Sequence, residues 1–270
     1  MRFISLPEKD GRFYYKTKRC YLMSLIEEFS LQLYSLRELI KEDFPGVLKR
    51  VGEIGYTGVE FAGYGGLTAS QMHSLLKENG LKSISSHVSL ERLINNLDEE
   101  LSYNREIGTQ TIIVPYYPLK TIHDVEILAE QLAPIAKAVR SKGFMFGYHN
   151  HAHEFAKSED GTVLLDLLMQ LTDPKDIILE LDVYWAAYAG VDVLAYMEKQ
   201  RNRIRLLHLK QMADFESRKC VDLDEGVLDF HAIICKGLEI GVQHCILEQE
   251  EFAVSPYQSI EKGYKHIMNL

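Results

Sequence analysis

Side chains that could bind a metal ion stand at the ends of four apolar segments in the second half of the chain. The segments are FMFGYHNH (144–151), IILELD (177–182), IRLLHLK (204–210) and CILEQE (245–250), and their terminal polar residues include His149, His151, Asp182, His208 and Glu248. Imidazole and carboxylate ligands together favour Mn²⁺, Zn²⁺, Co²⁺ or Fe²⁺ over Mg²⁺ and Ca²⁺. A divalent ion at such a site could bind adjacent hydroxyl and carbonyl oxygens of a sugar and acidify the C–H bond between them.

Each of these residues also has a structural interpretation. Asp182 ends an apolar run just before Tyr184 and Trp185, so its carboxylate could cap a helix or hydrogen-bond the end of a strand. A single histidine in such a position is as often a satisfied buried side chain as it is a ligand. The polar endings of four successive segments are a more specific signal, and together they favour a functional site.

Apolar segments and amphipathic segments alternate from Phe29 onward, with short connections. Strands are expected at 30–36, 58–61, 81–88, 111–115, 144–149, 177–182, 204–209 and 243–249. Helices are expected at 43–54, 68–79, 91–107, 121–142, 162–171, 192–200, 229–238 and 255–268. This alternation predicts a (β/α)8 barrel whose site lies at the C-terminal ends of the strands. A doubly wound sheet is the rival, but it would need a glycine-rich turn after the first strand, and LQLYSLRELI contains none.

Other polar residues point toward the same rim if the barrel is correct. Neighbouring strands lie roughly 5 Å apart, so ligands from consecutive strand ends can converge on one ion. The remaining rim candidates are Gln32, Tyr34, Glu60, His87 and Tyr116. Glu154 in the HAHEF segment is either a second carboxylate of the site or an exposed loop charge.

Composition excludes several classes of protein. The chain has 270 residues, which suits one barrel, and its formal net charge of −9 argues against a nucleic-acid partner. No apolar run is long enough for a membrane span, and no signal peptide is apparent. The four cysteines lack metal-binding spacing, so we expect a cytoplasmic protein with reduced thiols, Cys235 and Cys245 being buried. Residues 1–22 are basic and aromatic and receive no function, while 23–270 are expected to form a single barrel domain.

Several motifs, taken in order, resemble the sugar phosphate isomerase/epimerase family of the xylose isomerase-like TIM barrel superfamily. They are LQLYSLR, GYTGVEFAGYGG, YHNHAHEF, LDVYWAAYAGVD, RIRLLHLKQM, DEGVLDF and ILEQEEF, and the resemblance covers about residues 29–268. The superfamily also contains inosose dehydratases, tagatose-type ketose epimerases and an endonuclease branch that acts on abasic DNA. The charge of this chain and its smaller ligand set disfavour the last of these.

The resemblance implies a metal site of Asp182, His208 and Glu248, with a fourth ligand on the fifth strand. That fourth ligand is a glutamate in the epimerase branch, whereas YHNH places His149 there. The change removes one of the two glutamates that epimerases use as paired acid and base. Glu248 then remains a candidate base, with His151, Glu154 or Lys210 as its possible partner. The residues expected to contact the substrate are Gln32, Tyr34, Glu60, His87, Trp185 and Lys210.

These observations predict a metal-dependent isomerase or epimerase of a small sugar or sugar phosphate, which takes a proton from a carbon beside a metal-bound carbonyl. A dehydratase of an inosose-like or dehydroshikimate-like keto-polyol begins with the same step and is the alternative. A non-catalytic barrel that binds a sugar is the third. The expected partner is a small sugar, sugar phosphate or cyclitol, without nucleic acid or membrane, and a homo-oligomer stays open.

Overall fold

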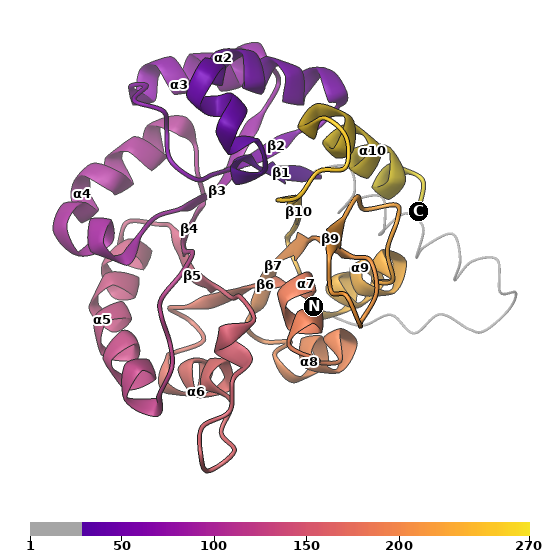
Figure 1. Ribbon diagram of the computed structural model, residues 1–270. Coiled ribbons are helices and arrows are strands. Elements are labelled where there is room, and N and C mark those ends of the chain that lie inside the picture. The colour runs from indigo at the N-terminus through magenta and orange to yellow at the C-terminus, as the bar shows by residue number, and fades with distance from the viewer. Residues whose placement is uncertain (1–28) are drawn as a thin grey trace, which may run out of the picture.

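Eight parallel strands close into a barrel in the computed structural model, which describes residues 29–270 (Figure 1). The strands are β1 (Ser30–Gln32), β2 (Gly58–Phe61), β3 (Lys82–His87), β4 (Thr111–Val114), β5 (Met145–His149), β6 (Ile178–Asp182), β7 (Ile204–Leu209) and β10 (His244–Leu247). They pair in the order β1-β10-β7-β6-β5-β4-β3-β2. The predicted (β/α)8 barrel is therefore confirmed.

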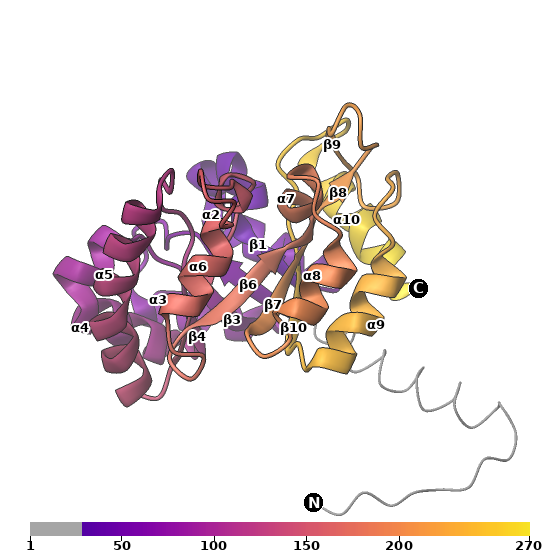
Figure 2. The same ribbon diagram turned by 90° about the horizontal axis from the view of Figure 1, so that it is seen from below.

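Helices surround the barrel, and Figure 2 shows them packed against its outer side. They are α2 (Arg37–Ile54), α3 (Ala69–Glu78), α4 (Leu90–Ile107), α5 (Ile122–Ser141), α6 (Leu164–Leu171), α7 (Val183–Tyr188), α8 (Val193–Lys199), α9 (Phe230–Ile240) and α10 (Pro256–Met268), with short 3-10 helices η1 (Leu33–Leu36) and η2 (His153–Phe155). Each longer helix buries one apolar stripe, as Val125, Leu128 and Leu132 do on α5. No helix among residues 29–270 is long and apolar enough to cross a membrane.

The helix boundaries follow the local signals in the sequence. A capping box of Thr68 and Gln71 begins α3, and Ser255 caps α10 just ahead of Pro256. Gly55 and Gly108 follow the last turns of α2 and α4 with φ of 119° and 81°. An L-residue with a side chain rarely adopts this left-handed conformation, so glycine ends both helices at low cost.

The start of the barrel differs from the prediction in two ways. The strand expected at 30–36 stops at Gln32, because the Gln32 side chain accepts a hydrogen bond from the Tyr34 backbone and turns the chain into η1. Helical structure begins at Arg37, ahead of the predicted start at Asp43. A helical segment does start at Asp43 as predicted, because Asp43 is non-helical, with φ −152° and ψ 83°, and its carboxylate accepts the Gly46 N–H and so caps the second part of α2.

One loop adds a small sheet to the barrel, and two further expectations concern the cysteines and the N-terminal extension. The loop 211–226 contains an antiparallel ribbon of β8 (Gln211–Met212) and β9 (Cys220–Val221). Cys245 is buried as predicted, but Cys235 is only half-buried, and both have free thiols. The extension predicted at 1–22 lies outside the described residues.

The barrel interior changes from apolar to charged along the strands. Ile113, Leu206 and Ile246 pack together as an apolar floor with Ile178 beside them. Successive inward side chains on a strand are two residues apart, so the next level above this floor is made by the residues two positions further along each strand. On β6 and β7 these are Glu180 and His208, both fully buried. The fold thus places charged groups above a dry floor and below the mouth.

Candidate metal and substrate site

Three strands supply the polar interior with the same two-residue period. Above Ile178, β6 presents Glu180 and then Asp182, and β7 and β10 continue in the same way with His208 and Glu248. In register, Asp182 lies beside His208 on the neighbouring strand. Parallel strands end at the same side of a barrel, so these side chains meet at one place.

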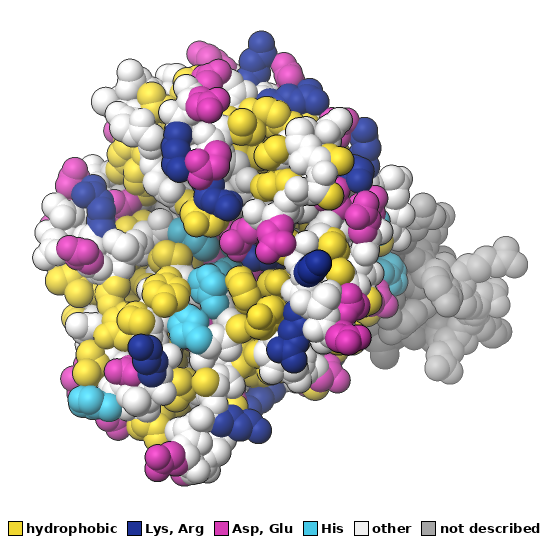
Figure 3. All heavy atoms as spheres, viewed as in Figure 1, with side chains coloured by type: hydrophobic (Ala, Val, Ile, Leu, Met, Phe, Trp, Pro, Cys, Tyr) yellow, Lys and Arg dark blue, Asp and Glu magenta, His cyan; other side chains and the backbone are white. Residues whose placement is uncertain are grey.

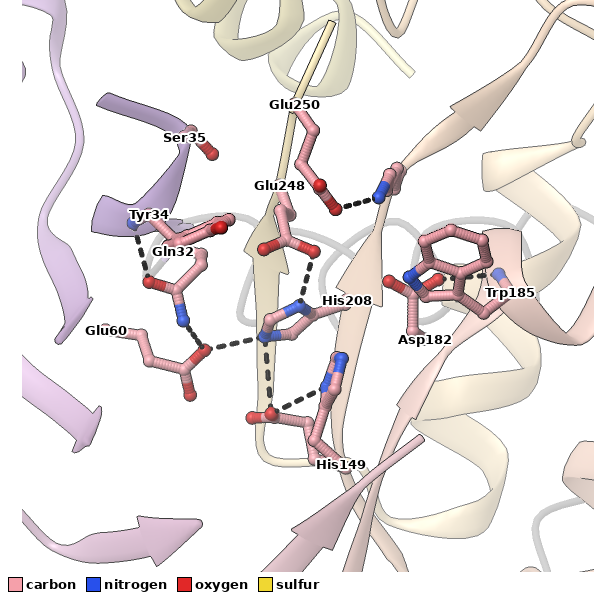
Figure 4. Close-up of polar contacts among 12 residues, drawn as sticks. Gln32, Tyr34, Ser35, Glu60, His149, Asp182, Trp185, His208, Glu248 and Glu250 are labelled. Carbon is pink, nitrogen blue, oxygen red and sulfur yellow. Dashed lines mark hydrogen bonds and ion pairs between the residues drawn. The ribbon is translucent and has the colours of Figure 1, made fainter. Parts of the chain in front are cut away.

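Four of the predicted residues converge into one possible ligand set, and Figure 4 shows them pointing toward one another. Each offers one ligand atom, all of these atoms lie within 4.8 Å of one another, and every member is buried. We call this set the outer ligand group: His149, Asp182, His208 and Glu248.

Two atoms of the outer ligand group support a cation in particular. Asp182 Oδ2 and His208 Nδ1 are buried and have no hydrogen-bond partner among the described residues. A buried polar atom without a partner is costly, and such atoms often mark a missing ion or water. Two imidazoles and two carboxylates match the donor set of Mn²⁺, Zn²⁺, Co²⁺ or Fe²⁺. The residues present therefore fit a transition-metal ion.

Asp182 both caps a helix and offers an oxygen to the site, the two roles that the sequence allowed for it. Its Oδ1 accepts the Trp185 backbone N–H at 2.9 Å and so caps α7, while Oδ2 is left for the site. The side chain of Asn150 adds to this support, since its Oδ1 accepts the Asp182 N–H at 3.1 Å. Capping thus fixes the direction of the second oxygen.

The two carboxylates of the outer ligand group differ in charge. Burial alone would raise the pKa of Glu248, but the interaction with the His208 imidazole, 3.5 Å away, and the charge of Lys210 hold that pKa at about 2. Burial raises the pKa of Asp182 to about 7 because the nearby Lys210 compensates only in part. Glu248 is therefore ionised at neutral pH, and a bound cation would favour ionised Asp182 as well.

A cavity of about 440 Å³ opens over the outer ligand group at the barrel mouth. Figure 3 shows histidine and acidic side chains gathered in the central hollow of this side of the molecule. The lining residues are Tyr34, Ala62, His87, Pro115, Tyr116, His149, His151, Trp185, Glu248 and Glu250. This volume has room for one small sugar.

Comparison with known proteins agrees with this architecture. A family described as the xylose isomerase-like TIM barrel matches residues 48–269. The chain belongs to this family. The resemblance seen in its motifs is thereby confirmed.

Three relatives are distant in sequence but match most of the chain. An inosose dehydratase of Geobacillus kaustophilus is 23% identical, over 86% of this chain and 91% of that protein. The crystal structure of a sugar phosphate isomerase/epimerase from Parabacteroides distasonis has a TM-score of 0.78 and 25% identity, over 88% of this chain and 92% of that one. A probable 3-DHS dehydratase of Bacillus anthracis has a TM-score of 0.67 at 17% identity, over 90% and 99%, and shows the shared fold alone.

Several residues predicted to contact substrate do not line the cavity of this xylose isomerase-like barrel. Gln32 and Glu60 are fully buried and bonded to each other, with 2.6 Å between Gln32 Nε2 and Glu60 Oε1. Lys210 is 1% exposed, pairs with Glu250 and lies 4.5 Å from the centre of the Trp185 ring. All three support the cavity wall or floor, whereas Tyr34, His87 and Trp185 do line it.

Glu154 matches neither of its predicted roles. It is fully buried, and it accepts hydrogen bonds from the Tyr148 hydroxyl at 2.9 Å and from the His151 backbone N–H at 2.8 Å. It does not line the cavity, so we assign it a structural role in holding the turn that carries His151. His151 itself lies at the cavity wall against the Trp185 ring.

Glu180 is the main residue that the sequence analysis missed. Its carboxylate lies beneath the outer ligand group and contacts His87, His149 and His208. The signal was present, because Glu180 precedes Asp182 by two residues and must point to the same side of β6. Glu250 was also missed as a cavity residue. It follows Glu248 by two residues, so the same alternation would have placed it on the side of Glu248.

The charge of His151 gives a testable pH dependence. Burial lowers its pKa to about 4, from the ordinary histidine value of 6.5. The unfolded chain therefore binds more protons than the folded chain between these values, so stability falls as pH falls from 6.5 toward 4. His151→Gln should remove this part of the loss, on the order of 1 kcal/mol at pH 5 after allowance for partial exposure.

Thermal melting of both metal-free proteins measures this effect. A pH range of roughly 7.5 to 4.5 covers most of the interval between the histidine pKa in the unfolded and in the folded chain. The wild type should lose melting temperature more steeply than His151→Gln. Parallel curves would show that His151 does not change its pKa on folding.

Proposed function

We propose that this protein is a metal-dependent enzyme that takes a proton from a carbon beside the carbonyl of a small keto sugar or keto cyclitol. Isomerisation or epimerisation is the leading outcome. The observation that carries the proposal is the outer ligand group at the base of the 440 Å³ cavity, with its two buried ligand atoms that have no hydrogen-bond partner among the described residues.

The side chains around the cavity have distinct roles in this proposal. The outer ligand group would hold a divalent ion, and such an ion supplies Lewis-acid polarisation of a substrate carbonyl. Glu248 is ionised at neutral pH and lines the cavity, so it can accept the proton. His151 is neutral there, which makes it the second group able to accept or return a proton. Trp185 presents an aromatic wall to the C–H bonds of the substrate.

Dehydration is the second candidate reaction. The inosose dehydratase of G. kaustophilus shares 23% identity with this chain over nearly the full barrel. His149 stands where the epimerase branch has a glutamate, so the site offers only one carboxylate pair on the β10 side, Glu248 and Glu250. A site with one ionised carboxylate at the cavity suits removal of a proton followed by loss of a neighbouring hydroxyl group as water.

Mass spectrometry of the products separates these reactions. Purified protein would be incubated with Mn²⁺ and a panel of ketoses, ketose phosphates and inososes. An isomerase or epimerase gives a product of unchanged mass and altered retention time, whereas a dehydratase gives a product lighter by one water. Binding without any product across the panel would support the non-catalytic sugar-binding barrel instead.

The cavity further favours an uncharged substrate. None of the described residues that line it is lysine or arginine, and two are the carboxylates Glu248 and Glu250. Lys210 lies behind them, and its charge is already engaged by Glu250. A phosphate group is normally held by arginine, lysine or free backbone N–H groups. Carboxylates and aromatic rings instead suit hydroxyl groups and C–H surfaces.

We expect an uncharged keto-polyol to be converted at least tenfold more efficiently than its phosphate ester, which corresponds to about 1.4 kcal/mol of discrimination. The measurement is kcat/KM for a matched pair, such as a ketose and the same ketose carrying a phosphate. Equal efficiency, or a preference for the ester, would refute the assignment of an uncharged substrate.

A further inference from the structure

A second set of possible metal ligands lies directly below the first and shares two residues with it. This inner group consists of His87, His149, Glu180 and His208. Since His149 and His208 belong to both groups, the two sets are either two cation sites or one cation site with a supporting layer. The distances between the ligand atoms distinguish these cases.

Two atoms bound to one ion at about 2.1 Å are separated by roughly 3.0 to 3.4 Å for bond angles of 90° to 110°. In the lower layer, His87 Nε2 lies 2.7 Å from Glu180 Oε2, and His208 Nε2 lies 2.6 Å from Glu60 Oε1. Both separations are those of charge-assisted hydrogen bonds. Glu180 Oε2 also lies 3.1 Å from His149 Nδ1 and 3.4 Å from His208 Nε2. In the outer ligand group, His208 Nδ1 lies 3.5 Å from Glu248 Oε2, which is longer than an ordinary N–H···O hydrogen bond. The lower layer is thus held by short hydrogen bonds between its own side chains, whereas the outer group is more widely spaced.

The hydrogen bonds also determine which ring nitrogens face the ion. His149 uses Nδ1 toward Glu180 Oε2, at 3.1 Å, which leaves its Nε2 for the outer site. His208 uses Nε2 toward Glu60, which leaves Nδ1 for the outer site, and that atom has no hydrogen-bond partner among the described residues. The two rings are therefore held by opposite nitrogens, each by a carboxylate from another strand.

We propose that Glu60 and Glu180 form a buried carboxylate tier that orients both imidazole ligands and fixes which nitrogen of each binds the metal. His87 joins the two carboxylates, since its Nε2 lies 2.7 Å from Glu180 Oε2 and 3.1 Å from Glu60 Oε1. Glu60 and Glu180 are positioning residues in this account, and the inference rests on the metal site of the proposed function.

Glu60, one of the two carboxylates of the tier, is itself held in place by neutral donors. Gln32 Nε2 donates to Glu60 Oε1, and the Ser85 hydroxyl donates to Glu60 Oε2. The carboxylates of Glu60 and Glu180 are completely buried, so neither can exchange its protein partner for solvent. Gln32 and Glu60 therefore lie below the cavity and support the ligands, although the sequence predicted them to contact the substrate. Carboxylate partners of metal-binding imidazoles typically change metal affinity by about 10- to 100-fold.

The test uses Glu180→Gln, which keeps the shape of the side chain and removes its charge. Glu60→Gln is the second variant, and of the two imidazole ligands it addresses only His208. Glu100→Gln is the matched control, because Glu100 is equally buried and hydrogen-bonded but lies on α4. The measurements are the affinity for Zn²⁺ by competition with a chelator, the visible absorption spectrum of the Co²⁺-loaded protein, and melting of the metal-free protein.

We expect Glu180→Gln and Glu60→Gln to bind Zn²⁺ about 10- to 100-fold more weakly and to shift the Co²⁺ spectrum, while Glu100→Gln changes neither. If Glu180→Gln does not fold, the same loss in Glu60→Gln carries the result. Folded tier variants with wild-type affinity and spectrum would overturn the tier, leaving the proposed metal site intact. Wild-type protein that binds neither ion would overturn both.

Discussion

His208→Ala should leave the purified protein with little or no bound transition metal. His208 is fully buried, and its Nδ1 is one of the two atoms of the outer ligand group that have no hydrogen-bond partner among the described residues. Its removal deletes one of four ligands and also one of the two imidazoles that contact Glu60. Elemental analysis after loading and gel filtration should find about one ion per chain in the wild type and less than about a tenth of that in the variant, since losing a ligand costs at least as much as losing its carboxylate partner.

Two companion variants make this result specific. Asp182→Asn retains the Oδ1 atom that caps α7 and replaces the free carboxylate oxygen with an amide group, so the fold is kept and the metal should still be lost. His123→Ala removes an exposed histidine of α5 and should retain the ion. Equal metal in wild type and His208→Ala would refute the assignment of the ligands.

Glu248→Gln should still bind substrate but should no longer exchange the proton next to the substrate carbonyl with deuterated water. The amide keeps the size of the side chain and an oxygen that can face a metal, while the basicity is removed. General-base catalysis typically contributes about 10² to 10⁴ in rate, so the loss of kcat should lie in that range with KM little changed. Deuterium incorporation followed by mass spectrometry measures the exchange, and saturation kinetics measures KM.

Glu251→Gln is the control for Glu248→Gln, since Glu251 is an exposed carboxylate in the same segment. It should exchange at the wild-type rate. Exchange that survives in Glu248→Gln and vanishes in His151→Asn would move the base to the β5 side of the cavity. Glu248 would then be a metal ligand only.

The fold was predictable because its signals are local and repeat along the chain. Each strand is a short apolar run, each helix has an apolar stripe, and caps such as Thr68 and Gly108 mark the boundaries. The convergence of Asp182, His208 and Glu248 was predictable for the same reason, since a closed parallel barrel brings its strand ends together. Alternation along β6 would also have identified Glu180, had it been followed one step inward.

The depth of each side chain was not predictable, because depth depends on the tilt and stagger of the strands. Gln32 and Glu60 stand at strand ends like the ligands do, yet the barrel places them below the cavity, where they are hydrogen-bonded to other protein groups. Glu154 looks like a loop charge in the sequence, but Tyr148 and the His151 backbone bind it inside the protein. The early end of β1 depends on a single side-chain contact between Gln32 and the Tyr34 N–H.

Deuterium incorporation into an uncharged keto-cyclitol or ketose by the wild-type protein tests the central claim most directly. The protein would be stripped with a chelator, divided, and assayed in deuterated water with and without added Mn²⁺ or Zn²⁺. The account predicts one deuterium at the carbon beside the carbonyl in the metal-loaded sample and none above background in the stripped sample. Equal incorporation in both samples, or product formed from the loaded enzyme without any deuterium at that carbon, would contradict it.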